Sequence, residues 1–410
     1  MFGKVNDGVI REGFMTEKEM KRFSKGADMG KKILLSKHLQ RMKDISQSRM
    51  NNSFLLIGER GETSKNFVIP NIKEHNSSYV VIDPEGEIYG QVKDDLDGYT
   101  VKCMDLSSGM KDGAVAYYNP FHYAKAKKDV MNILECLLGD NSGFFGGAKN
   151  DFLAACIFHF LEHNEDLSFC TLWEFVSNFT GNEFEKDDKD GLAVEYYDRF
   201  SHTAVRQTQE SVIKGCVSLL EQYLYLDAKD QLGLDKMQEE HIALFIIPPK
   251  ETDKAADNVI SLLLSQLCDM HSGVSHAENV HVKPDHTIEC IFMDMKHEKN
   301  FDLPYYSAVM HTDEVNFVIS ISAVSQLKDI YDDKWRDVAY NFETWIFYST
   351  YAKDTLDLVC KEAGGKVGFQ FFHPLLTLDE LDDLAGQGKC LVLQWGQKPA
   401  IDDPLTADIE

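Results

Sequence analysis

A strand, a turn and a helix follow one another near residue 53, and this unit limits the folds open to the chain. The apolar run at 53–57 is typical of a buried strand, and the segment at 58–65 leads into a helix expected to begin near Asn66. A phosphate-binding loop in this position has the spacing G-x-x-x-x-G-K-[ST]. Counted from Gly58, that spacing puts three other residues where Gly, Lys and Ser or Thr belong: Thr63, Ser64 and Lys65. The sequence therefore predicts the frame of a nucleotide-binding fold around a degenerate loop.

Each departure removes a specific contact with nucleotide. The second Gly lets backbone N–H groups approach phosphate, the Lys neutralises the β- and γ-phosphates, and the hydroxyl binds Mg²⁺. Glu59 and Glu62 add repulsion, since a carboxylate about 4 Å from a phosphate oxygen costs roughly 4 kcal/mol at an effective dielectric of 20. We expect no bound cofactor and a vestigial loop made of Gly58, Gly61, Thr63, Ser64 and Lys65. The alternative is a divergent working loop in which Lys65 or Arg60 supplies the charge, with ATP and magnesium as cofactors.

Composition narrows the class of partners. The 410 residues carry a formal net charge of -25, which favours solubility and disfavours a non-specific grip on DNA or on acidic lipid. The N-terminal segment still leaves room for a local basic surface patch, at Lys31, Lys32, Lys37, Arg41 and Lys43.

The spacing of the cysteines and the hydropathy of the chain indicate a location in the cytoplasm. The nine cysteines are scattered with no C-x-x-C spacing, which argues against a disulfide framework and against a cysteine-ligated zinc site. The apolar runs are shorter than the roughly 18 residues that a membrane span needs, and residues 1–43 contain no signal-peptide core. We predict a soluble cytoplasmic protein that reaches the inner face of the membrane only through partners.

Periodicity divides the chain into five parts. The polar N-terminal segment, 1–52, contains a helix capping box at Thr16 and is expected to be a surface or docking segment. Alternating strands and helices at 53–126 and again at 240–400 predict one α/β domain in two pieces, followed by a tail at 401–410. Helical periodicity dominates 127–239, so this part is predicted to be an all-α domain inserted into the other.

The predicted elements specify this α/β class in more detail, as a twisted, mostly parallel sheet. The expected strands are 54–57, 79–82, 99–103, 242–247, 290–293, 317–320, 344–348 and 390–394. The expected helices include 130–138, 151–163, 171–179, 211–226 and 255–270. The acidic stretch at 183–191 is interpreted as an exposed loop within the helical part.

A second strand end carries the other half of a nucleotide site. The apolar run at 291–293 ends in Asp294, which could hold Mg²⁺ through water. The next position, where hydrolysing relatives of such folds carry a Glu that activates water, is Met295. A thioether cannot accept a proton, so no confident catalytic residue is predicted.

A competing motif is H-x-x-E-H at 159–163. It places His159 and His163 on one helical face, where they could bind zinc, with Glu162 as a general base. The simpler interpretation is a helix that packs its apolar residues inward and carries histidines near its C-terminal end, where the helix dipole favours them. The two histidines are therefore kept as weak metal candidates.

Taken together, the motifs resemble the TraG/TraD family of type IV secretion coupling proteins, hexameric ATPases that pump DNA during conjugation. The resemblance covers about residues 12–400 and rests on collinear segments: the strand and loop at 54–65, Phe67, Pro70-Asn71, VVIDPEGE at 80–87, YNPF at 118–121, ALF at 243–245, the strand ending at Asp294, SQLK at 325–328 and TLDEL at 377–381. It implies a RecA-like P-loop NTPase fold with an inserted all-α domain.

The positions that carry the family's activity differ in this chain. The resemblance places Ser64 at the family's P-loop Lys, Lys65 at its Mg²⁺-binding Thr and Met295 at its catalytic Glu. The Lys of the family's D-P-K-G-E turn corresponds to Glu85, and its Gln-Asn pair that senses γ-phosphate corresponds to Ser322-Ala323. Asp294 alone is kept at the centre of the site, and the two membrane helices that begin most members have no counterpart here.

The leading hypothesis is a coupling-protein-like pseudo-ATPase that acts through protein interactions of its helical domain. Implied partners are an active coupling protein, a relaxase or other secretion components, in a homo- or hetero-oligomer, with DNA disfavoured by charge. The first alternative is an active, divergent DNA-translocating ATPase that uses Lys65 or Arg60. The distant alternative is a zinc metalloprotease at His159, Glu162 and His163.

Overall fold

The computed structural model describes most of the chain. The described residues are 9–11, 13–29, 31–107, 116–139, 143–203, 206–226, 229–271, 286–296, 300–310, 314–368 and 371–405. Half of the predicted tail, 406–410, lies outside the described residues.

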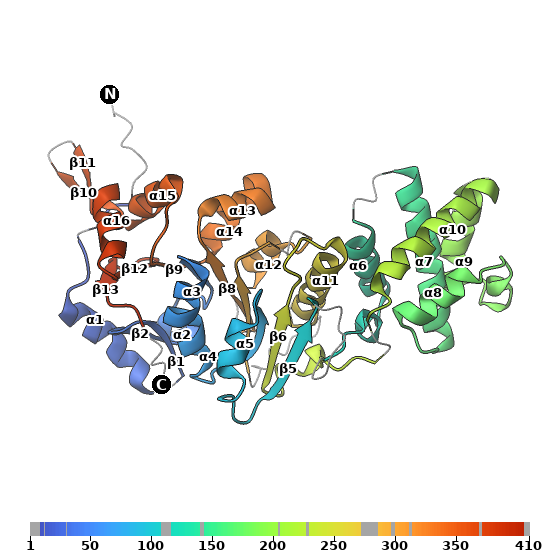
Figure 1. Cartoon of the computed structure of the whole chain (residues 1–410), viewed down its shortest axis with the longest axis horizontal. Coiled ribbons are helices and arrows are strands. Elements are labelled where there is room, and N and C mark those ends of the chain that lie inside the picture. Colours follow the sequence, from blue (N-terminus) through green and yellow to red (C-terminus); the bar gives the residue numbers. More distant parts are fainter. Residues whose placement is uncertain are drawn as a thin grey trace.

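The centre of the fold is a nine-stranded sheet in the order β13-β12-β9-β3-β8-β7-β4-β6-β5 (Figure 1). Its strands are β3 Phe54–Ile57, β4 Ser78–Ile82, β5 Thr100–Asp105, β6 Ile242–Ile247, β7 Ile288–Met293, β8 Val315–Ile321, β9 Thr344–Phe347, β12 Cys390–Gln394 and β13 Ala400–Asp402. Neighbours from β9 to β5 are parallel, whereas β12 is antiparallel to both β9 and β13. Each strand expected from the sequence is present, and the predicted mostly parallel sheet is confirmed.

Two hairpins and the edge strand β13 were not predicted. β1 Lys32–Ser36 pairs antiparallel with β2 Leu39–Met42, and β10 Gly365–Gly368 pairs with β11 Phe371–Pro374. The β1–β2 strands are short and buried on one side only, so their apolar content is too low to separate them from a polar surface segment.

The N-terminal segment packs against the sheet. The predicted capping box is confirmed, because Thr16 Oγ1 accepts a hydrogen bond from Glu19 N at the start of α1 Glu17–Ser24. The expected basic surface patch is wrong for Arg41 and Lys43, which are both buried. Arg41 donates to Thr344 Oγ1 in β9 at 3.1 Å, because the hairpin turns this side chain toward the sheet.

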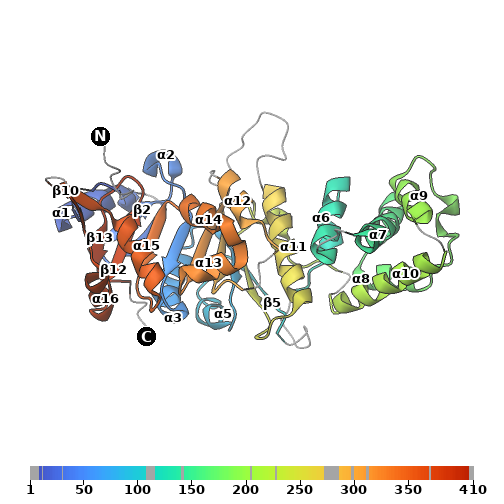
Figure 2. The same ribbon diagram turned by 90° about the horizontal axis from the view of Figure 1, so that it is seen from above.

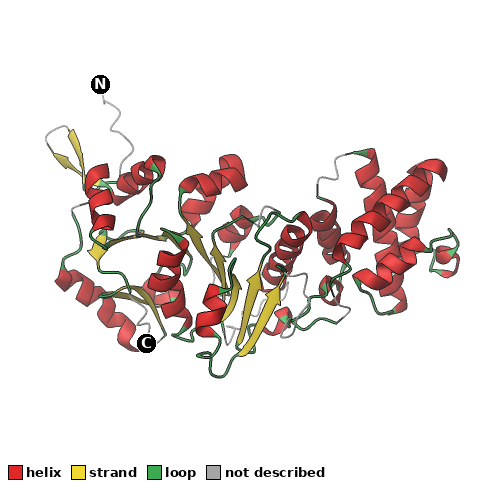
Figure 3. Ribbon diagram, in the orientation of Figure 1, coloured by secondary structure: helices red, strands yellow, loops and turns green. Residues whose placement is uncertain are grey.

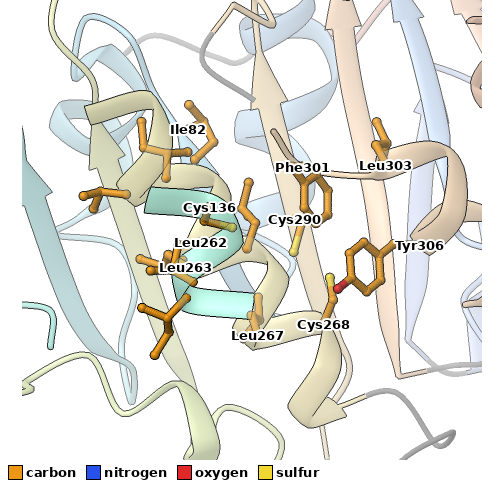
Figure 4. Packing of buried hydrophobic residues seen from close by; sticks show 14 of the residues in the cluster. Ile82, Cys136, Leu262, Leu263, Leu267, Cys268, Cys290, Phe301, Leu303 and Tyr306 are labelled. Atoms are coloured by element: carbon orange, nitrogen blue, oxygen red, sulfur yellow. The ribbon is translucent and has the colours of Figure 1, made fainter. Parts of the chain in front are cut away.

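Both faces of the sheet are covered. Side chains of β3 alternate, so that Leu55 and Ile57 enter one buried cluster while Phe54 and Leu56 enter the other. The first face carries α11 Lys254–His271, α12 Leu303–Val309, α13 Val324–Tyr331, α14 Trp335–Asn341, α15 Lys353–Ala363 and α16 Leu378–Gly386. The second carries α1, the β1–β2 hairpin, the π-helical turn Ser64–Val68 that follows α3 Arg60–Thr63, α4 Ile69–Ile72 and α5 Glu87–Val92. Figure 4 shows part of the first cluster, to which Leu262 and Leu267 of α11 and Cys290 of β7 belong.

Helices alone fill the described chain between β5 and β6. They are α6 Lys127–Leu138, α7 Phe144–His163, α8 Phe169–Ser177, α9 Leu192–Thr203 and α10 Arg206–Leu220, with short 3-10 turns between some of them. α7 to α10 form a lobe at one end of the molecule that contains no strand in Figure 3, and α6 with α11 lies between this lobe and the sheet in Figure 2. The prediction of helices inserted between strands of one sheet is confirmed, whereas the boundaries 127 and 239 stay predictions.

The acidic stretch at 183–191 is not the fully exposed loop that was predicted. Glu183–Lys186 forms a 3-10 turn that buries Phe184 among Phe179, Phe175 and Tyr197. The carboxylate of Asp187 is buried as well. The prediction from charge density alone was wrong because one aromatic residue, Phe184, packs this acidic stretch against the helical lobe.

No helix within the described part of the chain is both long enough and apolar enough to cross a bilayer. Most of the nine cysteines are buried, and none of them forms a disulfide bond in the described structure.

Candidate nucleotide site

The predicted site residues meet at the carboxyl edge of the sheet. β3 lies between β8 and β9, and β7 lies on the other side of β8. The loop after β3, Asp294 after β7 and Ser322 after β8 are therefore brought to neighbouring strand ends. In open α/β sheets this edge is where ligands bind.

The loop after β3 is occupied by a helix. α3 begins at Arg60 rather than near Asn66, and it continues through a π-helical turn, Ser64–Val68, into α4. The N–H groups of Glu62 and Thr63 both donate to Glu59 O at 2.9 Å, and Ser64 N donates to Arg60 O. A phosphate-binding loop instead directs such N–H groups at the ligand. Here they are used inside the helix.

A carboxylate lies in front of Gly58. Gly58 is buried and its N–H donates to Ile321 O at 2.9 Å. A Cβ atom on Gly58 would lie 3.1 Å from Glu62 Oε2 and 3.1 Å from Tyr348 Cβ, so both neighbours would have to shift to admit a side chain. Glu62 Oε2 also accepts a hydrogen bond of 2.5 Å from Ser349 Oγ, which holds the carboxylate in place.

The three residues at the defining loop positions point to different surroundings. Thr63 is fully buried, and its hydroxyl shares a hydrogen bond of 2.6 Å with Ser320 Oγ of β8. Ser64 is buried and donates to Gly61 O at 3.2 Å. Lys65 is exposed to solvent. The Thr63 side chain therefore lies inside the fold against β8, whereas the Lys65 side chain lies at the surface.

Pro70 explains the wide helical turn. It has no N–H group and cannot donate to the carbonyl of Asn66, as a regular α-helix would require. The helix widens instead, so that Ile69 N donates to Ser64 O. Tyr348, buried just after β9, donates its hydroxyl to Asn66 O at 3.3 Å. The carbonyl that Pro70 leaves free is thus satisfied from the neighbouring strand.

Asp294 has both carboxylate oxygens engaged by side chains. Its φ of 62° marks a left-handed turn directly after β7, and its N–H donates to Ser320 O at 3.2 Å. Oδ1 accepts a hydrogen bond of 2.6 Å from Gln326 Nε2, and Oδ2 lies 2.7 Å from Lys296 Nζ. Met295 is only 2% exposed and belongs to the apolar core, so the residue directly after Asp294 offers no proton acceptor.

Two further turns complete the edge. After β4, the buried Asp83 carboxylate accepts a hydrogen bond from Tyr89 N at 2.9 Å and thereby caps α5, while burial raises its pKa. Glu85 in the same turn is exposed and forms an ion pair of 2.6 Å with Arg60. One of the two candidate substitutes for the P-loop Lys is therefore paired with a carboxylate.

Gln326, Ser320 and Ser349 are site neighbours that sequence reasoning missed. Gln326 Oε1 accepts a hydrogen bond of 2.7 Å from Ser322 N, and the same amide donates to Asp294. It therefore ties the turn after β8 to the turn after β7. The segment around Gln326 was recognised as a motif, but its partner Asp294 lies 32 residues away and only the strand order brings the two together.

The structure places the two histidines of the H-x-x-E-H motif together and directs its Glu elsewhere. His159 and His163 lie one turn apart on α7 and face Asp187, with His159 Nδ1 2.7 Å from Asp187 Oδ2. Glu162 turns away, and its Oε1 accepts from Leu192 N at 2.7 Å at the start of α9. The predicted role of Glu162 as a base beside a metal does not match this placement.

The sheet order and the loop position define the fold class as a RecA-like P-loop NTPase fold, as the sequence predicted. No protein-family model matches the chain, and no curated protein matches it in sequence. Among solved structures it is similar to the bacterial conjugative coupling protein TrwB.

The similarity to TrwB extends over nearly the whole chain. TrwBΔN70 in a trigonal form with sulphate aligns over 98% of this chain and 96% of its own, with a TM-score of 0.71 and 13% identity. TrwB in complex with ADP and Mg²⁺ aligns over 100% and 98%, again with a TM-score of 0.71 and 13% identity. VirB4 of Thermoanaerobacter pseudethanolicus aligns over 93% and 97%, with a TM-score of 0.50 and 12% identity. The resemblance to coupling proteins is thus confirmed as a similarity of fold.

Proposed function

We propose that this chain is a coupling-protein-like component of a conjugation or type IV secretion system that does not hydrolyse ATP and acts through protein interactions. The observation that carries the proposal is the filled phosphate loop. The N–H groups of Glu62, Thr63 and Ser64 are bound within the helix, and the Glu62 carboxylate lies against Gly58. These residues do not fit the phosphates of a nucleotide.

Electrostatics supports the same conclusion. A phosphate oxygen about 4 Å from the Glu62 carboxylate would be repelled by roughly 4 kcal/mol at an effective dielectric of 20, close to a thousandfold in affinity. Ser64 offers no positive charge, and Asp294 already binds Gln326 and Lys296. The buried thioether of Met295 cannot activate water.

The alternative is a divergent ATPase that takes its phosphate charge from Lys65 or Arg60. Lys65 favours it because this residue is exposed to solvent. Arg60 would first have to leave Glu85, an exposed pair worth at most about 1 kcal/mol. Both routes also require the first turn of the helix to unwind, because its N–H groups are engaged.

Thermal unfolding with and without nucleotide tests the proposal. A ligand that binds the folded state stabilises it by RT ln(1 + [L]/Kd), so millimolar MgATP and a micromolar Kd would add about 4 kcal/mol. We expect no rise in melting temperature with MgATP or MgADP, and no phosphate release. Lys65→Gln and Arg60→Gln serve as matched controls. A rise in the unsubstituted protein that either variant abolishes would establish the alternative.

The fold similarity to TrwB and VirB4 supports partners of the same system. We infer an active coupling protein or a relaxase as the partner, bound at least in part by the helical lobe, where Phe144 and Phe145 at the start of α7 are exposed. The charge of -25 disfavours DNA as the direct ligand. The protein would act in the cytoplasm and reach the membrane through such a partner. Co-elution in gel filtration at micromolar concentration is expected, and separate elution from every coupling protein and relaxase of its system would contradict it.

A further inference from the structure

Three metal-ligating side chains meet in the helical lobe, far from the phosphate loop. His159 and His163 lie one turn apart on α7, and Asp187 follows the 3-10 turn Glu183–Lys186. One ligand atom from each of the three lies within 4.8 Å of the other two. The lobe and the sheet edge β13 lie at opposite ends of the molecule (Figure 1).

We propose that His159, His163 and Asp187 form a binding site for a divalent cation of the zinc class, which holds the acidic 183–187 segment against α7. The donor set of two imidazoles and one carboxylate suits Zn²⁺ and its neighbours rather than Ca²⁺ or Mg²⁺, which require more oxygen ligands.

His163 is already oriented as a ligand. Its Nδ1 donates a hydrogen bond of 2.8 Å to His159 O, so in the neutral ring the lone pair is on Nε2. Nε2 lies 3.7 Å from Asp187 Oδ1, too far for a hydrogen bond. A ring N–H bonded to a backbone carbonyl is the usual outer support of a metal-bound histidine.

Asp187 supplies the independent observation that points to a cation. Its side chain is only 1% exposed, and Oδ1 is buried without a hydrogen bond from any described residue. Oδ2 contacts His159 Nδ1 at 2.7 Å. Burying a carboxylate oxygen without a hydrogen bond is costly, and a cation bound between Asp187 Oδ1 and the Nε2 lone pair of the neutral His163 ring would satisfy both atoms.

The spacing is close to that of a metal site. Zinc bonds of about 2.0–2.2 Å to nitrogen and oxygen place tetrahedral ligand atoms about 3.3 Å apart. The contacts of 2.7 and 3.7 Å lie on either side of that value, so small side-chain rotations suffice. His159 would bind through Nδ1 with its ring hydrogen on Nε2.

The surroundings favour a structural role over hydrolysis. Phe175 and Phe184 pack around the His159 ring, with centroids 5.1 and 5.5 Å away, so the inner side is apolar. The His163 side chain is 40% exposed and leaves an entry path and a fourth position for water. Glu162 is engaged at the start of α9, so no base stands beside this position. The cation would tie α7 to the acidic segment.

Zinc and cobalt binding to the full-length, tag-free protein after chelator treatment tests the proposal. We expect about one equivalent of Zn²⁺ per chain by elemental analysis and calorimetry, and a Co²⁺ absorption spectrum typical of four or five ligands. His163→Gln and Asp187→Asn should each weaken zinc binding by at least about tenfold. Zinc should also raise the melting temperature of the unsubstituted protein, and EDTA should reverse the rise.

Two control variants make the outcome specific. Glu162→Gln should keep full binding, since its carboxylate caps α9. His38→Gln should also keep full zinc binding. His38, Asp402 and Asp403 form a second group with comparable spacing, but their carboxylates already have partners. Ser36 Oγ donates to Asp402 at 2.7 Å, and Lys389 forms an ion pair with Asp403. His163 is half-exposed, so His163→Gln should fold even where Asp187→Asn does not, as circular dichroism can show. Absence of saturable zinc binding, or equal binding by His163→Gln, would overturn the proposal.

Discussion

Glu289→Gln is expected to lower the free energy of unfolding by about 3 kcal/mol. Glu289 lies in β7, in the middle of the sheet, where its neighbours across the strands are Tyr79 and Asn316. Its Oε1 lies 3.1 Å from Lys43 Nζ, and the two side chains are only 11% and 5% exposed. This ion pair fastens the chain after β2 to the underside of the sheet.

The magnitude follows from what the substitution leaves behind. Without the carboxylate, the Lys43 ammonium would be buried among neutral acceptors, which include Asn76 O and Ser77 Oγ. Removing one partner of a buried pair costs roughly 3–5 kcal/mol, and glutamine keeps one oxygen as an acceptor, which places the cost near the lower limit. The double variant Lys43→Met/Glu289→Met removes both charges and should come within about 1 kcal/mol of the original stability.

Urea unfolding followed by far-UV circular dichroism measures the effect. The exposed pair between Lys73 and Asp95, at 2.8 Å, offers a matched control, for which Asp95→Asn should cost less than about 1 kcal/mol. The reasoning fails if Glu289→Gln costs no more than Asp95→Asn. It also fails if the double variant is less stable than Glu289→Gln alone, because the desolvated Lys43 charge would then not be the cause.

Two further predictions concern the edge strand and the turn after β4. Burial raises the pKa of Asp402, but hydrogen bonds from His38 and Ser36 outweigh it and hold the pKa below its ordinary value of 3.8. Asp402→Asn should therefore lower the free energy of unfolding at neutral pH. In urea unfolding, the stability difference between the variant and the unsubstituted protein should vanish as the pH falls through the pKa of Asp402 in the folded state. A stability difference that grows on acidification would refute the prediction. Gly86 has a φ of 67°, and a Cβ there would lie 2.9 Å from Ile247 Cδ1, so Gly86→Ala should cost about 1–3 kcal/mol in the same assay, whereas an unchanged midpoint would count against the strain.

The parallel sheet could be predicted because the amino-acid composition of each strand indicates how deeply that strand is buried. Strands buried on both faces are continuous apolar runs, such as β3 and β6, so local composition is sufficient to locate them. The β1–β2 hairpin is buried on one side and mixes polar with apolar residues, so the same criterion misses it. Glu289 was not predicted as a strand residue for a related reason. A charged residue in a central strand is stable only with a buried partner such as Lys43, which is distant in the sequence.

The residues on which the proposed lack of ATPase activity rests, Ser64, Lys65 and Met295, could be identified from the sequence alone. The contacts that surround them could not be predicted. The wide turn at Ser64–Val68 combines Pro70 with a hydrogen bond from Tyr348, which follows β9. The Glu62 carboxylate is held before Gly58 by Ser349, which also follows β9.

The sequence by itself thus determined the fold class, the order of the parallel strands along the chain and the identities of the residues in the loop after β3. Only the tertiary structure decided that Asp294 binds Gln326 and that Asp187 joins His159 and His163. The physical reason is the range of the interactions. Hydrophobic periodicity arises within one element, where each residue's neighbours are set by its own helix or strand. Hydrogen bonds and metal ligands come from elements tens of residues apart, whose meeting depends on strand order and packing.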